Sequence, residues 1–230
     1  MKKIFTLLLI GIFCIGCSSD SDSSSSSSLS STPMAKAEFD TKNFGIYKGV
    51  FSGSSGTVLI NIKNDSDVIK AVLVIDGTTY NFTCTEDATL GQAITGLTFT
   101  SGDMSFDVNV SATGDDIAVV SSTIPAHPGA TFNIIKEYST DLVRCYQGTY
   151  TGSAQGTLNL ILIDQEIYGL SRSNEEGSEA QFLNGSFIEN QINGSFNGGG
   201  FSGSMSGNNI SGQWQNDLQE SGTWTGRRTL

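Results

Sequence analysis

The single histidine of the chain, His127, lies in the proline-containing segment Ile124–Gly129. A histidine acts as a general base when a nucleophile or a carboxylate lies beside it. The sequence contains neither the G-x-S-x-G pattern of a hydrolase nucleophile nor the H-E-x-x-H pattern of a metalloprotease. One histidine and few cysteines also disfavour a zinc site. We therefore interpret His127 as a residue of a stiff loop.

Carboxylates recur in pairs at three expected turns, which contain Asp65 and Asp67, Asp115 and Asp116, and Glu175 and Glu176. Such a pair can bind calcium, or it can hydrolyse a glycoside as an acid and a base. Acidic side chains at hairpin tips are more often simply solvated. We therefore predict no catalytic residues, no metal site and no cofactor, and a hydrolase is the least favoured function.

Four aromatic residues are the candidate ligand-lining residues: Phe187, Phe196, Trp214 and Trp224. They occupy the alternate strand positions that we assign to the buried face of the C-terminal sheet. One interpretation is an aromatic lining for an apolar ligand or a sugar. The alternative is ordinary core packing.

The charge balance limits the class of partner. The chain of 230 residues has 12 basic and 23 acidic residues and a formal charge of −11. A nucleic-acid-binding protein needs a cationic face, so nucleic acid is excluded as an expected partner. Charged residues are 15% of the chain and 27 residues are glycine, so polarity comes mainly from Ser, Thr, Asn and Gly.

The N-terminus has the organisation of an export signal. Two lysines precede the apolar run Ile4–Gly16, which is too short to span a bilayer but has the length of a signal-peptide core. The run ends at Cys14-Ile15-Gly16-Cys17, which resembles the lipobox of bacterial lipoproteins, with Cys14 where that family usually has Leu. The resemblance implies that residues 1–16 are removed and that Cys17 carries the lipid. The alternative is an ordinary cleaved signal peptide.

The segment after Cys17 supports a lipid anchor. Its Ser18–Ser28 tract contains two aspartates among serines and is similar to the stretch that follows the lipidated cysteine in lipoproteins of Bacteroidota. That resemblance implies an outer-membrane protein facing the periplasm or the cell surface. We predict that residues 17–43 form a flexible tether. Loss of residues 1–16 removes two lysines and leaves a charge of −13, so the lipid itself must hold the protein at the membrane.

Two cysteines remain, Cys84 and Cys145, in a compartment that permits disulfides. They can form one bridge. Alternatively they are separate thiols, because Cys84 shares a strand face with Tyr80 and Phe82 and fits a core position.

The folded part reads as β-structure throughout. Alternation with period two follows Pro33, and no window of 12 residues shows a convincing helical repeat. We predict two tandem antiparallel meander units, at residues 44–140 and 141–230. In support, Tyr47–Gly53 and the following Gly56–Ile60 match Tyr146–Gly152 and Gly156–Leu160, which indicates an internal duplication.

The second unit shows the clearest pattern, an apolar residue, a glycine and another apolar residue at alternate positions. The repeat occurs at Leu183-x-Gly185-x-Phe187, Ile192-x-Gly194-x-Phe196, Phe201-x-Gly203-x-Met205 and Ile210-x-Gly212-x-Trp214. Glycine normally weakens a strand. On a buried face it leaves room for rings from neighbouring strands and lets a small sheet bend into a barrel.

Each unit contains about eight short strands. For the first unit we predict strands near 46–53, 56–63, 68–76, 78–84, 94–100, 104–111, 116–123 and 130–138. Eight strands close into a barrel that is just filled or holds one small ligand. The pattern resembles the calycin-type barrels of streptavidin and the lipocalins, although no ligand-binding residue set carries over. A β-sandwich is the alternative; a calcium β-roll and a membrane-spanning barrel do not fit the sequence.

These features predict a lipid-anchored, non-enzymatic binding or interaction module of the cell envelope. Its partner is expected to be a glycan, a small apolar ligand or another envelope protein. The alternative is a barrel that inhibits or sequesters a protein partner. An aromatic-lined cavity favours ligand binding, a filled interior favours a protein partner, and a cleft with two facing carboxylates favours an enzyme.

Overall fold

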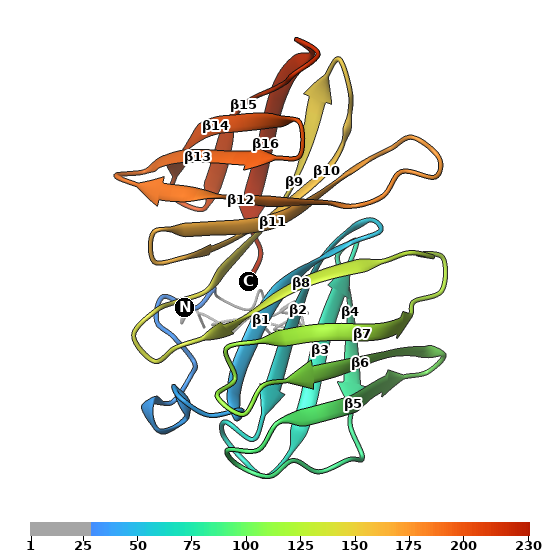
Figure 1. Ribbon diagram of the computed structural model, residues 1–230, viewed down its shortest axis with the longest axis vertical. Helices are drawn as coiled ribbons and strands as arrows, with labels where there is room; N and C mark the ends of the chain where they lie inside the picture. Colours follow the sequence, from blue (N-terminus) through green and yellow to red (C-terminus); the bar gives the residue numbers. More distant parts are fainter. Residues whose placement is uncertain (1–28) are drawn as a thin grey trace, which may run out of the picture.

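The computed structural model describes residues 29–230, so the predicted signal peptide, Cys17 and the whole Ser18–Ser28 tract lie outside the described residues. The described part contains sixteen strands and one short 3-10 helix, Ala37–Phe39. The strands form two eight-stranded antiparallel units that lie one above the other in Figure 1. The predicted all-β fold with two tandem meander units is therefore confirmed. Between residues 29 and 230, no helix is long and apolar enough to cross a membrane.

The first unit contains eight strands within about one residue of their predicted bounds. They are β1 (Gly45–Ser52), β2 (Ser55–Ile62), β3 (Ile69–Ile75), β4 (Thr78–Thr83), β5 (Ile94–Ser101), β6 (Met104–Val110), β7 (Ile117–Thr123) and β8 (Thr131–Glu137). Their spatial order is β7-β6-β5-β4-β3-β2-β1-β8. The sheet curls so far that β7 and β8 approach each other, but these two strands are not hydrogen-bonded as neighbours.

The first unit thus forms a nearly closed barrel where the sequence predicted a closed one. Two local features account for the difference. The register between β6 and β7 shifts between Asp107 and Val108, and such an irregularity turns an edge strand away. The β7–β8 connection also contains Pro125 and Pro128, which have no amide hydrogen to extend the ladder into a tight hairpin.

Phenylalanine rings fill the interior of the first unit. Phe106 lies at the centre, with ring centroids 5.0 Å from Phe99, 5.1 Å from Phe82 and 5.6 Å from Phe132. Phe51 continues the cluster at 5.2 Å from Phe132. The interior of this unit is therefore a hydrophobic core.

The second unit is a closed barrel. Its strands are β9 (Arg144–Gly152), β10 (Gly156–Ile163), β11 (Glu166–Ser173), β12 (Gln181–Ile188), β13 (Gln191–Phe196), β14 (Gly199–Ser206), β15 (Asn209–Asn216) and β16 (Ser221–Arg228). Consecutive strands pair, and β16 pairs with β9 to complete the circle. Full closure leaves this unit without an exposed sheet edge.

The buried-face glycines of the second unit provide the space for aromatic rings, as predicted. A Cβ atom at Gly212 would lie 2.6 Å from the Trp224 ring, and a Cβ at Gly222 would lie 2.6 Å from the Trp214 indole nitrogen. The strand register places Gly212 directly opposite Trp224 and Gly222 directly opposite Trp214. Each tryptophan therefore lies across a glycine of the neighbouring strand.

The two units begin in the same way, which supports the duplication. Phe51 on β1 lies opposite Gly56 on β2, and Tyr150 on β9 lies opposite Gly156 on β10. In both units the ring packs against that glycine. The first strand of each unit also pairs with the last strand of the same unit.

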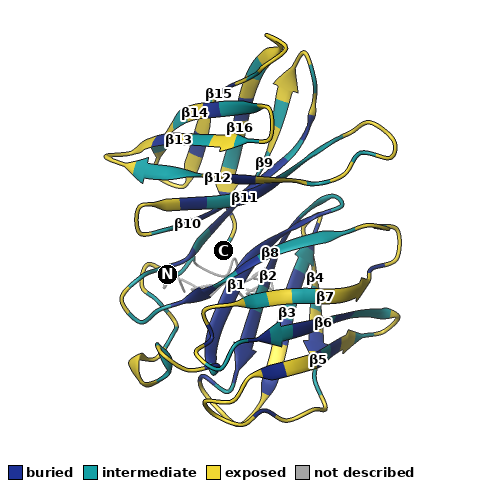
Figure 2. Cartoon of the chain, viewed as in Figure 1, coloured by how far each residue is buried: buried dark blue, intermediate teal, exposed yellow. Residues whose placement is uncertain are grey.

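The outer faces of β1, β10 and β11 pack against one another and join the units. Val50 of the first unit lies in one buried cluster with Val143, Cys145, Ile161 and Leu170. Figure 2 shows this buried band between the two units. The junction is therefore a third buried apolar cluster, separate from the cores inside the two units.

Polar bonds surround the apolar junction. The Asn159 side chain donates to the Phe51 carbonyl at 2.9 Å, and its carbonyl oxygen accepts from the Ser55 hydroxyl at 2.9 Å. A fully buried ion pair joins Lys48 Nζ to Glu137 Oε2 at 2.5 Å. The same Glu137 oxygen accepts from the Val143 amide at 3.0 Å, so the pair lies at the connection between the units.

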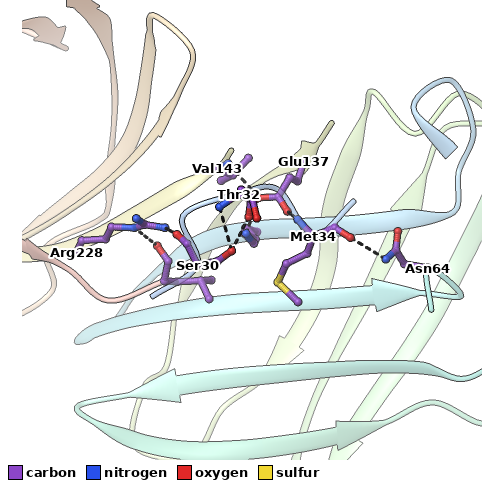
Figure 3. Close-up of polar contacts among 9 residues, drawn as sticks. Ser30, Thr32, Met34, Asn64, Glu137, Val143 and Arg228 are labelled. Carbon is purple, nitrogen blue, oxygen red and sulfur yellow. Dashed lines mark hydrogen bonds and ion pairs between the residues drawn. The ribbon is translucent and has the colours of Figure 1, made fainter. Parts of the chain in front are cut away.

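Residues 29–43 pack against the body, so the prediction that they belong to a flexible tether is wrong. The Met34 amide donates to Glu137 at 2.6 Å, and the Met34 carbonyl accepts from Asn64 at 3.0 Å (Figure 3). Arg228 near the C-terminus donates to the Ser30 carbonyl at 2.6 Å (Figure 3). These contacts depend on single side chains rather than on an alternating pattern, which is why the strand periodicity did not include this segment.

Candidate functional site

The second barrel contains a cavity of about 370 Å³. The turns after β9, β11, β13 and β15 lie at one end of the barrel, and the cavity opens between them. Its apolar lining consists of Tyr150, Ala154, Leu158, Leu183, Phe196, Phe201, Trp214, Leu218 and Trp224. Three of the four aromatic residues that the sequence suggested as ligand-lining are among them: Phe196, Trp214 and Trp224.

Both tryptophans present hydrocarbon surface to the cavity because their polar groups are already paired. Trp214 Nε1 donates to the Thr151 carbonyl at 3.0 Å, and Trp224 Nε1 donates to the Gln213 carbonyl at 3.1 Å. A buried indole N–H that is paired with the sheet leaves its ring free for apolar contact. The two tryptophans therefore combine both roles considered from the sequence, since each is a core residue and a cavity wall.

Tyr150 and Phe201 hold the tryptophans in place. Tyr150 meets Trp214 edge-to-face at 5.8 Å, and Phe201 meets Trp224 in the same way at 6.1 Å. Burial raises the pKa of Tyr150, and the negative charge of Glu175 adds to this shift. The phenol is therefore neutral at physiological pH, and the aromatic wall carries no charge.

Polar groups are concentrated at the mouth of the cavity. The polar lining residues are Ser171, Gln181, Asn197, Asn216 and Asp217. Asn216 is fully engaged, because its side chain accepts from the amides of Leu218 and Glu220 and donates to the Glu220 carboxylate at 2.7 Å. Leu218 is 80% exposed at the rim. The mouth thus combines an apolar side chain with a few hydrogen-bonding groups and one carboxylate, that of Asp217.

Phe187 lies away from this cavity, so its predicted role as a ligand-lining residue is not supported by the structure. It contacts the guanidinium of Arg144, whose carbon is 5.4 Å from the ring centroid. Nearby, the Tyr146 hydroxyl lies 3.0 Å from the Met205 sulfur. The opposite directions of neighbouring strands explain the separation, because Phe187 lies near the end of β12 and Phe196 at the end of the antiparallel β13. Successive strand ends lie at opposite ends of a barrel.

The possible bridge between Cys84 and Cys145 is not formed, and both residues are free thiols. Cys145 is fully buried in the cluster between the units, whereas Cys84 packs beside the core of the first unit. The alternative of two separate thiols describes the structure. Their positions in different clusters are the physical reason.

Neither His127 nor any residue of the three carboxylate pairs lines the cavity. His127 packs edge-to-face against Phe51 at 5.6 Å, which agrees with a structural role. Asp115 accepts from the Tyr138 hydroxyl at 2.9 Å. Among residues 29–230, no group of three or more histidine, cysteine or acidic residues is arranged to hold a metal ion.

Sequence reasoning missed six apolar residues of the cavity wall, of which Tyr150, Leu183 and Phe201 are the most informative. All three carried a usable signal. Leu183 and Phe201 lie in the glycine repeat, and Tyr150 lies in the segment that is duplicated between the units. Only the closure of the barrel, which brings β9 beside β16, places Tyr150 next to the tryptophans.

Comparison with known proteins gives no match, since no protein-family model, no curated protein and no solved structure is similar to this chain. The geometry of the cavity and of the surface therefore carries the functional argument. That argument rests on shape, burial and charge.

Proposed function

We propose that this protein is a lipid-anchored outer-membrane protein whose second barrel binds a small, neutral, apolar molecule without changing it chemically. The observation that carries the proposal is the cavity with Trp214, Trp224, Phe196 and Phe201 on its wall. Its volume is within the range of small-molecule sites. Since benzene occupies an engineered cavity of ~150 Å³, about 370 Å³ suits a ligand of about 15 non-hydrogen atoms.

The charges of the lining favour a neutral ligand. Asp217 is the one charged residue of the lining, and no cation is present there to pair with a carboxylate or a phosphate. The predicted mature chain also has a charge of −13, which repels anions. One carboxylate is too few for glycoside hydrolysis by an acid and a base, which supports binding over catalysis.

The anchor is the second part of this proposal and rests on the sequence around Cys17. We expect the full-length protein to be found in the membrane fraction and to incorporate labelled fatty acid. Cys17→Ser removes the acceptor thiol and should release the protein from the membrane fraction. Persistence of a labelled, membrane-bound Cys17→Ser protein contradicts the lipid anchor.

Ligand binding can be read from tryptophan fluorescence, because the two tryptophans of the chain both line the cavity. The probe is 1-naphthylphenylamine, a neutral apolar fluorophore that accepts energy from tryptophan. With the chain beginning at Ser18, we expect saturable quenching of tryptophan emission and a matching rise in probe emission.

Ala154→Phe places a ring in the cavity and should weaken binding of the probe at least tenfold. Ala112→Phe, in the β6–β7 turn of the first unit, is the matched control. Absence of quenching, or equal affinity of the two variants, overturns the proposal.

A further inference from the structure

We propose that the outer wall of the second barrel binds a neutral polysaccharide. The outer wall is the set of outward-facing residues of β13 to β16 that precede Arg227. Its members are Gln191, Asn193, Ser195, Gly200, Ser202, Ser204, Ser206, Asn209, Ser211, Gln213, Gln215, Ser221, Thr223 and Thr225. Every side chain in this set carries a hydroxyl or an amide, apart from one glycine, and none is charged. Arg227, the next outward position of β16, carries the one charge on the outward face of these four strands.

The strand register arranges these groups in rows across the barrel. Asn193 lies opposite Ser202, Ser202 opposite Gln213, and Gln213 opposite Thr223. Neighbouring strands are about 4.8 Å apart, so a donor or acceptor recurs at that interval along each row. Sugar hydroxyls also recur along a polysaccharide, and each is both a donor and an acceptor.

The hydrogen-bonding groups at the centre of the wall are free for a ligand. Asn193, Ser202 and Gln213 are exposed, and their side chains form no hydrogen bond within residues 29–230. The one hydrogen bond of the Thr223 hydroxyl within the described residues is with the Thr151 hydroxyl, at 3.4 Å. An amide can both donate and accept, as a sugar hydroxyl requires.

An open groove of about 1000 Å³ follows the same rows. Its lining includes the side chains of Asn193, Ser202, Gln213 and Thr223. Gly200 also lines it, and the lack of an outward side chain there lowers the floor of the groove. Asp217 of the β15–β16 turn contributes the one carboxylate of the lining. The wall is thus hollowed where its free polar groups are located.

The scarcity of charge indicates the class of partner. A surface designed only to remain soluble is given Lys, Arg, Glu and Asp at about 25–35% of its positions. The outward positions of β13 to β16 carry a single charge, at Arg227, whereas outward positions of the first unit include Lys70 and Asp107. A charged polymer would leave its charges unpaired on this wall, and an anionic one is also repelled by the acidic body. A neutral glycan has no charges to leave unpaired on the wall and is not repelled by the acidic body.

A second copy of the chain is a less suitable occupant, because two bodies of charge −13 repel each other. Each hydrogen bond exchanged with water contributes little net stability, so a single wall binds weakly. Many anchored copies engaging one long polymer bind more tightly than one copy does.

The test uses native electrophoresis of the chain beginning at Ser18, which retains every residue described here. The gels contain dextran, galactomannan, xyloglucan or mixed-linkage β-glucan as neutral probes, and alginate or polygalacturonate as anionic probes. We expect retardation in at least one neutral gel and none in the anionic gels. Retardation in no neutral gel, or an equal effect of the anionic polymers, overturns the proposal.

Paired variants localise the binding. Asn193→Ala with Gln213→Ala removes two central amides and should reduce the retardation at least threefold. The matched control is Asn81→Ala with Gln165→Ala, which removes one exposed Asn and one exposed Gln outside both the wall and the groove. Equal loss in both double variants, or concentration-dependent self-association that accounts for the retardation, overturns the proposal.

The cavity and the wall can be separated in the same assay. Ala154→Phe blocks the proposed ligand cavity on the inside of the barrel and should leave the polysaccharide retardation unchanged. Loss of retardation in this variant assigns the sugar to the cavity and overturns the outer-wall site. The fluorescence titration with 1-naphthylphenylamine then tests the cavity independently of the wall.

Discussion

Gly212 illustrates at the scale of single residues how the barrel positions its tryptophans. A Cβ atom there would clash with the Ser202 carbonyl oxygen and would lie 2.6 Å from the Trp224 ring. Trp224 is 1% exposed and lies across this glycine on the neighbouring strand. The glycine is therefore a packing requirement in a sheet where it would otherwise weaken the strand.

We predict that Gly212→Ala destabilises the protein by about 1–3 kcal/mol, because the ring and the backbone must both move. The intrinsic strand preferences of glycine and alanine alone predict that Gly212→Ala stabilises the protein. Gly200→Ala is the control, since its Cβ would meet one atom, the Gly194 carbonyl oxygen at 3.2 Å. Urea unfolding followed by tryptophan emission measures both variants. A Gly212→Ala protein as stable as the control contradicts the packing argument.

The two thiols allow a second residue-scale prediction. Burial raises the pKa of Cys145 to about 12, and burial together with the Glu86 carboxylate raises the pKa of Cys84 to about 12. The thiolate is the reactive form, so alkylation of the native protein near pH 8 should be far slower than that of a free cysteine. Cys145 should react only on unfolding, whereas half-buried Cys84 should react faster as the pH rises.

Mass spectrometry of iodoacetamide-treated protein checks this prediction. Because the folded pKa values lie above the unfolded ones, the stability associated with neutral thiols is complete below about pH 9 and is lost as the pH rises through 12. A disulfide-linked peptide pair containing Cys84 and Cys145 in non-reduced protein contradicts the free-thiol structure.

At the scale of elements, the two units differ in how their sheets end. The barrel of the second unit has no edge, whereas β7 and β8 of the first unit each have one side without a strand partner. Most residues of β7 are exposed, while every residue of β1 is buried. Exposed backbone hydrogen bonds with few buried neighbours open at a low free-energy cost.

We therefore predict that amide hydrogens of β7 exchange fastest among the strands of the first unit. Those of β1, which has a partner on each side, should be among the slowest. Hydrogen–deuterium exchange with mass spectrometry measures both. The pair β9 and β16, which closes the second barrel, is the internal comparison and should be protected. Equal exchange of β7 and β16 contradicts an open edge in the first unit.

At the scale of the whole molecule, the buried pair of Lys48 and Glu137 ties several parts of the chain together. Glu137 accepts from the amides of Met34 in the N-terminal segment and Val143 at the start of the second unit. Lys48 and Glu137 are 1% and 0% exposed. A buried ion pair is costly to break because the remaining charge has no compensation.

We predict that Lys48→Met destabilises the protein by about 3–5 kcal/mol and that adding Glu137→Gln restores part of the loss. Circular dichroism reports on both units, while tryptophan emission reports on the second unit alone. The two unfolding curves of the unmodified protein should coincide because a buried apolar cluster joins the units. Separate transitions contradict this view of the junction. No partial recovery in the double variant contradicts the charge argument.

The sequence alone determined the strands and much of the aromatic wall. Alternation is a local property, so Ile192, Gly194 and Phe196 already identify a strand, its buried face and its need for small residues. The sequence also contains Cys14-Ile15-Gly16-Cys17, and the resemblance of this segment to a lipobox is the basis of the proposed anchor. These features depend on neighbours within a few positions in the chain.

Only the tertiary structure decided which sides of these elements meet. Phe187 and Phe196 share one phase but lie at opposite ends of the barrel, because antiparallel strands alternate in direction. Tyr150 reaches Trp214 because β9 pairs with the last strand, β16. Cys145 lies in the junction between the units, whereas Cys84 packs beside the core of the first unit. Such contacts depend on closure, register and the packing of distant segments, and no local pattern encodes them.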